Sequence, residues 1–309
     1  MLSWQVKAAS DEIMTEKPVP YLSPQAAFAR QARRDREAAA LRENLRRRKV
    51  QTRARTDEHA LRPSATIIGS AVSPYVRKIM AVCDLKRIAW RCDPIVAFQG
   101  NDAFSRLNPL RRIPVFIDDQ VTLADSTAIA EYLDERYPTP ALFPDGAAAR
   151  ARARWIEEFA DSRMGDVFIW QIFNSAIIKP SVWKQPRDEA LITAAITNDL
   201  PGVMNYLESI APDDGFVCGA LAIADIAVAV HFANLQWSHT TADLSSWPRT
   251  MAWIARVDAV PEFARLTELG TRAISTRSAD RAAMYQAMGV ALTDTSYATS
   301  EFRKGPMSV

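Results

Sequence analysis

Residues 65–94 of the chain read ATIIGSAVSPYVRKIMAVCDLKRIAWRCDP, and this stretch sets the architecture of the domain around it. Residues 65–69 are a short apolar run that ends at a glycine, as a buried strand does. Ser73-Pro74 then opens a helical pattern, in which apolar residues recur at three- and four-residue spacing. A second apolar run follows at residues 88–92. A strand, a helix and a strand in this order predict a βαβ unit with two parallel strands.

The pattern continues with a further helix, a hairpin and a last helix. We expect these elements at residues 103–107, 114–117, 121–124 and 127–137. From residue 147 onward no strand pattern is visible, and long helical patterns follow, interrupted by prolines.

The sequence therefore predicts an α/β domain at residues 64–140 and an all-helical domain at residues 147–292. A polar tail without a clear period occupies residues 293–309, and a basic extension occupies residues 1–63. The extension offers a thin apolar face, so we expect it to be helical or partly disordered.

The composition excludes a chain that is disordered throughout, a collagen-like repeat and a disulfide scaffold. Hydrophobic residues make up 48% of the 309 residues and charged residues 24%, which is typical of globular domains. The net charge of +2 hides an excess of basic residues in the extension. Because no aromatic residue lies between Phe28 and Ile67, that segment has no stacking platform for bases, and nucleic acid is not expected as a partner.

The three cysteines are few and odd in number, which favours reduced thiols and a cytoplasmic location. No apolar run approaches the ~18 residues that span a bilayer, so no membrane partner is expected. Asp11, Glu12 and Glu16 lie where a secretory leader would have its apolar core, so we expect no such leader. The histidines and cysteines lack the spacing of a metal site, so no metal is predicted.

Four segments together resemble the cytosolic glutathione S-transferase superfamily. They are GSAVSPYVRKIMAV (69–82), NPLRRIPVF (108–116), LADSTAIAEYLDERYP (123–138) and GALAIADIAVA (219–229). The resemblance implies a thioredoxin-like βαβαββα module followed by an all-helical C-terminal domain, and it assigns no class beyond a serine-type member. It also implies a homodimer that conjugates glutathione, as co-substrate, to a small hydrophobic electrophile, a detoxification reaction.

The resemblance assigns a role to Ser73, whose hydroxyl would hydrogen-bond the glutathione sulfur and favour its thiolate. Read from the residues alone, Ser73 is a plain helix N-cap, and Ser70 is the alternative contact to the sulfur. Tyr75 lies within the predicted helix, and we expect its side chain to pack against neighbouring residues. Members that catalyse thiol transfer carry Cys directly before the Pro, so Ser73 at that position disfavours disulfide exchange.

The same resemblance implies the glutathione-binding residues. Pro114 would follow a cis bond, so that the Ile113 backbone pairs with the cysteinyl part of glutathione, and Arg112, or its neighbour Arg111, would bind the glycine carboxylate. Ser126, by default a helix cap, would take the γ-glutamyl carboxylate. Asp125 would face the γ-glutamyl ammonium.

The second-substrate pocket is expected near Trp155, Phe159 and Phe168, with Met164 and Trp170 close by, although aromatics at helical spacing are more often core. Asp225 is expected to be structural, satisfying backbone donors at a helix start, and His231 to be a core histidine.

Two other readings remain open. One is a glutathione-dependent isomerase or dehalogenase, and the other is a non-catalytic glutathione-transferase-like binding module.

Overall fold

A mixed five-stranded sheet organises the part of the chain that the computed structural model describes, residues 65–305. The strands run in the order β4-β3-β1-β2-β5; their bounds are β1 Ala65–Ile68, β2 Trp90–Asp93, β3 Val115–Ile117, β4 Thr122–Ala124 and β5 Ala291–Leu292. β1 and β2 are parallel, as the βαβ pattern predicts, whereas β3 is antiparallel to both β1 and β4. The extension predicted at residues 1–63 lies outside the described residues.

Helices cover both faces of this sheet. They are α2 (Pro74–Leu85), the 3₁₀ turn η1 (Ala97–Gln99), α3 (Asp102–Leu107) and α4 (Ser126–Arg136). Successive residues of a strand point to opposite faces, so Ile67 packs with the α2 and α4 side, while Ile68 packs with Phe104 of α3. The predicted βαβαββα order of the glutathione-transferase N-terminal module is therefore present.

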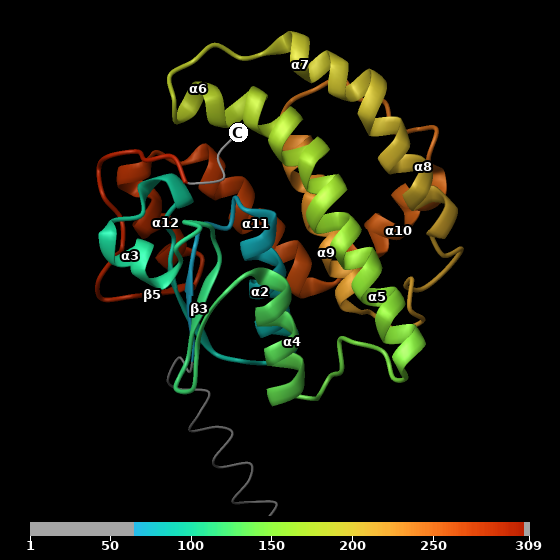
Figure 1. Cartoon of the computed structure of the whole chain (residues 1–309), viewed down its shortest axis with the longest axis horizontal. Coiled ribbons are helices and arrows are strands. Elements are labelled where there is room, and N and C mark those ends of the chain that lie inside the picture. Colours follow the sequence, from blue (N-terminus) through green and yellow to red (C-terminus); the bar gives the residue numbers. More distant parts are fainter. Residues whose placement is uncertain (1–64, 306–309) are drawn as a thin grey trace, which may run out of the picture. The chain divides into compact units, whose positions relative to one another are not determined.

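The rest of the described chain is mainly helical (Figure 1). The helices are α5 (Ala147–Phe159), the π-helical η2 (Ala160–Ile178), α6 (Lys179–Ser181), α7 (Glu189–Ala194), η3 (Ala195–Asp199), α8 (Leu200–Ile210), α9 (Ile223–Trp237), α10 (Pro248–Asp258), α11 (Pro261–Ser275), η4 (Ser278–Asp280) and α12 (Arg281–Ala287). α9 is buried along almost its whole length and contacts α5, η2 and α2. It thus joins the helical domain to the sheet domain. None of the described helices is long and apolar enough to cross a membrane.

The expectation that strands end before residue 147 is wrong. β5 lies after the last helix and pairs with β2 in parallel, where Arg91 and Cys92 face Ala291 and Leu292. The described part of the tail beyond β5 also packs on the sheet domain, because the Asp93 carboxylate accepts hydrogen bonds from Ser296 Oγ and Tyr297 N–H, both at 2.7 Å. The chain therefore returns to its first domain after building the helical one.

Candidate functional site

Ser73 caps the helix that follows β1. Its backbone is extended, with φ −74° and ψ 128°, and its Oγ accepts the Val76 N–H at 3.4 Å. Pro74 takes the first helical position, where a missing N–H costs nothing. Among the described residues the Ser73 hydroxyl is used only as an acceptor, so its hydrogen can be donated to a ligand at the N-terminus of α2.

Ser70, the alternative thiol contact, is placed differently. It is 1% exposed, and its Oγ accepts the Val72 N–H at 3.4 Å and lies 3.5 Å from the Tyr285 hydroxyl. The same Tyr285 hydroxyl accepts the Ala71 N–H at 2.8 Å. Ser70 thus holds the loop from behind, whereas Ser73 is only half-buried.

Side chains from α2 and from two helices distant in the sequence fix the loop between these serines. The Arg77 guanidinium, 1% exposed, donates to the carbonyls of Ala71 and Val72, to Val230 O and to Asn234 Oδ1. Asn234 in turn donates to the Val72 carbonyl at 3.0 Å. The sequence gives no local signal for Asn234 or Tyr285, because they lie on α9 and α12.

The loop before β3 meets the Ser73 loop closely. A Cβ on Gly69, whose φ is +146°, would lie 3.0 Å from Ile113 Cβ, so only glycine allows this approach. The bond between Ile113 and Pro114 is cis, as predicted. Within the described part of the chain, the backbone N–H and C=O of Ile113 have no hydrogen-bond partner.

The two arginines of this loop have different surroundings. Arg111 donates to Ser105 Oγ and, at 2.7 Å, to Gly100 O, so its side chain is used within the loop. Arg112 is exposed, and its charge acts on the nearby Tyr75. Burial and Asp161 raise the pKa of the Tyr75 hydroxyl, and the positive charge of Arg112 opposes that rise. Of the two arginines, Arg112 has the more exposed side chain. Tyr75 itself packs, donating to the Asp161 carbonyl at 3.1 Å.

The cap of α4 is Asp125 and not Ser126, contrary to the default expectation. Asp125 has φ +80°, and its Oδ1 accepts the Thr127 N–H at 2.9 Å and the Ala128 N–H at 3.4 Å. Both bonds use Oδ1, so among the described residues Oδ2 of this exposed side chain has no partner. Ser126 occupies the first helical position and is 5% exposed.

A buried charged cluster holds α2 and α4 against the helical domain. Lys78 Nζ donates to Glu157 Oε1 at 2.9 Å and to Asp161 Oδ2, and Thr127 Oγ1 donates to Glu157 Oε1 at 3.1 Å. Burial raises the pKa of Glu157, and the Lys78 ammonium opposes that rise. Because Thr127 follows Ser126 directly, the cluster fixes where the start of α4 lies.

Of the three aromatic residues predicted for the second-substrate pocket, Trp155 and Phe159 contact the same Tyr206, whereas Phe168 lies apart from them. Trp155 is 58% exposed and donates to the Tyr206 hydroxyl at 2.8 Å. Phe159 is half-buried against the ring of the same Tyr206. Phe168 is fully buried and packs edge-on to Phe232, so it belongs to the core and the expectation for it is wrong. A helical stripe of aromatics faces the core because that burial stabilises the domain.

Two residues expected to be structural are buried and bonded. Asp225 accepts from Val217 N–H, Ala222 N–H and Trp253 Nε1 at 2.9, 3.0 and 2.7 Å. His231 lies in the core with Nδ1 2.8 Å from Ala227 O.

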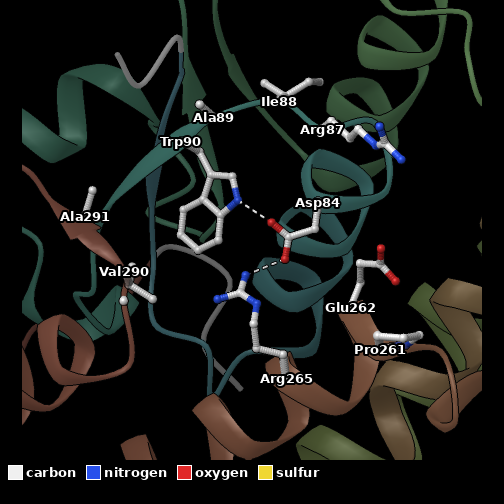
Figure 2. Close-up of a pocket in the computed structure, with 11 residues that line it drawn as sticks. Asp84, Arg87, Ile88, Ala89, Trp90, Pro261, Glu262, Arg265, Val290 and Ala291 are labelled. Atoms are coloured by element: carbon white, nitrogen blue, oxygen red, sulfur yellow. Dashed lines mark hydrogen bonds and ion pairs between the residues drawn. The ribbon is translucent and has the colours of Figure 1, made fainter. Parts of the chain in front are cut away.

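A cleft of about 740 Å³ is lined by Asp84, Trp90 and Arg265, among other residues (Figure 2). It borders the C-terminal end of α2, and Ser73 caps the other end; a helix of this length spans about 18 Å. Within this cleft Asp84 accepts from Trp90 Nε1 at 2.8 Å and from Arg265. No three metal-binding side chains gather anywhere in residues 65–305.

Known proteins resemble this chain in sequence and in fold. The family model for the glutathione S-transferase N-terminal domain matches residues 67–141. A probable maleylacetoacetate isomerase of Vibrio cholerae is 28% identical over 167 residues, covering 54% of this chain and 76% of that protein. A glutathione S-transferase of Hyoscyamus muticus is 25% identical over 207 residues, covering 65% and 96%.

A solved structure agrees over a similar length. The theta class glutathione S-transferase from the citrus canker pathogen Xanthomonas axonopodis pv. citri, with glutathione bound, superposes with a TM-score of 0.58 and 28% identity. The match covers 67% of this chain and 98% of that chain.

Proposed function

Because this chain belongs to the cytosolic glutathione S-transferase superfamily, we propose that it binds glutathione, stabilises its thiolate with Ser73 and transfers it to an electrophile. The observation that carries the proposal is the N-terminus of α2, where a half-buried hydroxyl has its hydrogen free to donate. Backbone N–H groups at a helix start favour negative charge. A thiol with an ordinary pKa of about 8.5 is therefore ionised more readily there.

The remaining groups fit the other parts of glutathione. The Ile113 N–H and C=O, which have no partner among the described residues, suit the cysteinyl backbone, and the exposed Arg112 suits the glycine carboxylate. Ser126 suits the γ-glutamyl carboxylate, while Asp125 Oδ2 suits the ammonium. In the chemical step the thiolate sulfur forms a bond to the electrophilic carbon. In a displacement, the bond from that carbon to its leaving group breaks and the group departs with the electron pair; in an addition, the π-electron pair moves to the neighbouring atom, which takes a proton from solvent. The thiol proton has already passed to solvent.

A glutathione-dependent isomerase is the second candidate, and the similarity to the Vibrio cholerae protein supports it. The same thiolate would add to a carbon–carbon double bond, permit rotation and leave again, so that glutathione is regenerated. The proposal also includes a homodimer and a cytoplasmic location. The three cysteines, which are all free thiols in the structure, fit that location.

The test follows the bound thiol. Retention on immobilised glutathione establishes binding, and ultraviolet thiolate absorbance against pH then measures the pKa of the bound thiol. Losing one charge-assisted hydrogen bond of about 1.5–3 kcal/mol in Ser73→Ala should raise that pKa by roughly one to two units. Turnover near neutral pH should fall about ten- to a hundredfold, with a much smaller change in glutathione affinity.

Three controls separate the alternatives. Ser73→Thr keeps both the cap and the hydroxyl and should restore the titration. Ser126→Ala should weaken binding more than chemistry. If the pKa of the bound thiol shifts in Ser70→Ala but not in Ser73→Ala, Ser70 is the residue that stabilises the thiolate. If that pKa shifts in neither variant, backbone amides alone stabilise the thiolate. A panel of electrophiles, haloaromatics and cis–trans isomerisable acids then separates transferase, dehalogenase and isomerase, and no turnover with any of them would support a binding module.

A further inference from the structure

The segment that follows β5 runs back beside the loop between β2 and α3, residues 94–101 (Figure 1). We call residues 296–303 of this segment the strap. Its first anchor is the Asp93 carboxylate, which is 2% exposed at the end of β2. One oxygen of Asp93 accepts from Ser296 Oγ and the other from Tyr297 N–H, both at 2.7 Å. The strap is therefore fastened to the sheet.

Backbone hydrogen bonds join the strap to this loop along its length. Three N–H groups donate between the two segments at 2.7–2.8 Å: Asn101 N–H to Tyr297 O, Thr299 N–H to Gln99 O and Arg303 N–H to Phe98 O. Gly100 lies within this pairing, opposite Ala298. Asn101 also caps α3, because its Oδ1 accepts the Phe104 N–H at 3.0 Å. The strap thus fixes both the loop and the start of the helix that follows it.

Gly100 connects the strap to the loop before β3. Its carbonyl accepts from the Arg111 guanidinium at 2.7 Å, and Ser105 Oγ of α3 accepts from the same guanidinium. Arg111 has φ +52°, a left-handed backbone state that a residue other than glycine keeps only where its surroundings impose it. The next residue is Arg112, whose carbonyl accepts from Asn108 Nδ2 at 2.9 Å. The direction of Arg112 therefore depends on contacts that the strap holds in place.

The strap reaches the same loop by a second route, through apolar packing. Tyr297 from the strap and Ile113 from the loop before β3 pack against one small core. Its members are four buried residues of β1, the loop after β2, α3 and β3: Ile68, Ile95, Phe104 and Val115. Ile113 is the residue whose backbone suits the cysteinyl part of glutathione, so both proposed contacts of this loop with glutathione are supported from the strap.

We propose that the strap positions Arg112 and Ile113 for glutathione, and that Ser296 and Tyr297 are positioning residues for this binding site. The inference rests on the proposed function, because its ligand is the glutathione assigned there. A loop without its strap samples other conformations, and the apparent affinity for a ligand falls by the fraction of time that the loop spends in the competent one. The strap therefore acts on binding and not on the thiol chemistry at Ser73.

The test compares two shortened chains. One ends at Asp294, which keeps β5 and removes the strap; the Asp93 carboxylate then meets water, so no buried charge loses its partners. The other ends at Lys304 and keeps every strap bond named above. Without the strap, the Kd for glutathione from calorimetry should rise about tenfold, as for a loop that is competent about a tenth of the time. The pKa of the bound thiol at saturating glutathione should stay unchanged, and the chain that ends at Lys304 should bind like the full chain.

Point variants test the strap in a chain of full length, whether or not the chain that ends at Asp294 folds. Ser296→Ala removes one of the two bonds to Asp93 and should raise the Kd for glutathione about two- to fivefold. Ser296→Thr keeps the hydroxyl and should restore the Kd. The matched control is Arg303→Gln, which removes only an exposed ion pair with Asp102 and should leave the Kd unchanged.

Hydrogen exchange provides the reciprocal measurement. If the strap favours glutathione binding, glutathione must favour the closed strap by the same factor. Saturating glutathione should therefore slow the exchange of the Thr299 and Arg303 amide hydrogens about tenfold in the full chain, and this protection should then level off. If the strap opened only when the whole protein unfolds, protection would keep rising with glutathione concentration, which would contradict the proposal.

The outcomes separate the strap from the proposed function. An equal Kd in the full chain and in the chain that ends at Asp294, or an equal rise in the chain that ends at Lys304, would overturn the inference and leave the proposed function in place. If the full chain does not bind glutathione, the proposed function is wrong, and exchange in residues 95–112 tests the strap. Faster exchange there in the chain that ends at Asp294 than in the chain that ends at Lys304 would support the strap, and equal exchange would overturn it.

Discussion

Replacing Asp225 tests what holds the helical domain together. The carboxylate is fully buried at the third residue of α9 and joins three parts of the chain. Oδ1 accepts the Val217 N–H at 2.9 Å and Trp253 Nε1 at 2.7 Å, and Oδ2 accepts the Ala222 N–H at 3.0 Å. Ala222 has no side-chain oxygen to cap α9, so Asp225 alone supplies the side-chain cap interaction.

The expected magnitude follows from those three bonds. Hydrogen bonds to a charged group contribute about 1.5–3 kcal/mol each, but removing the carboxylate also removes the cost of burying it. Asp225→Ala leaves three buried donors unpaired, so we expect the free energy of unfolding to fall by about 3–5 kcal/mol. Against a typical total of about 5–15 kcal/mol, such a loss brings the protein close to unfolding.

Milder variants keep the reasoning testable if Asp225→Ala does not fold. Asp225→Asn retains the two bonds to Oδ1 but sets an amide N–H₂ against the Ala222 N–H, so it should cost about 1–3 kcal/mol. Trp253→Phe removes one donor and should cost less than Asp225→Ala. Urea unfolding followed by far-ultraviolet circular dichroism gives each value. A loss below about 1 kcal/mol in Asp225→Ala, or equal losses in the Ala and Asn variants, would refute the reasoning.

Two further predictions concern pH and assembly. Burial lowers the pKa of His231 to about 4, so between pH ~6.5 and pH ~4 only the unfolded chain binds a proton on this residue, and the free energy of unfolding should fall by about 3 kcal/mol as pH decreases across that window. Urea unfolding of His231→Phe should therefore show a weaker pH dependence than that of the unmodified protein. An equal pH dependence in the two proteins would contradict this role of His231. Sedimentation should give a mass of two chains of 34.4 kDa each, and a single-chain mass at micromolar concentration would contradict the homodimer.

The order of elements in the sheet domain could be predicted because local chemistry specifies it. Ser73-Pro74 provides a cap and a first helical residue, and α2 begins at Pro74 as expected. The start of β2 is displaced because Ile88 has another role. Arg87 has φ +57°, and the Ile88 N–H donates to Cys83 O at 2.8 Å, which closes the C-terminus of α2. An apolar residue in a helix cap has the same appearance in a sequence as the first residue of a strand.

Other parts of the site depend on contacts that no local pattern records. β5 is two residues long and pairs with a strand about two hundred positions earlier, so its sequence carries no period of its own. Asp125, and not Ser126, caps α4. The cap position has a positive φ, a backbone state that Asp tolerates better than most residues. The burial of Ser70 depends on Tyr285, 215 positions away.

These distant contacts mean that the helical domain helps to build the thiol site. The loop that presents Ser73 is held by Asn234 and Tyr285 from the helical domain, and by a guanidinium from α2 that is itself held by α9. Burial lowers the pKa of Arg77 to about 9, which is still above neutral, so this group keeps its charge. Its hydrogen-bond partners in the loop and on α9 are neutral oxygens, and its positive charge therefore adds to the dipole of α2 behind Ser73. A sheet domain cut from the rest of the chain would keep Ser73 and Arg77 but lose the groups that hold them in place.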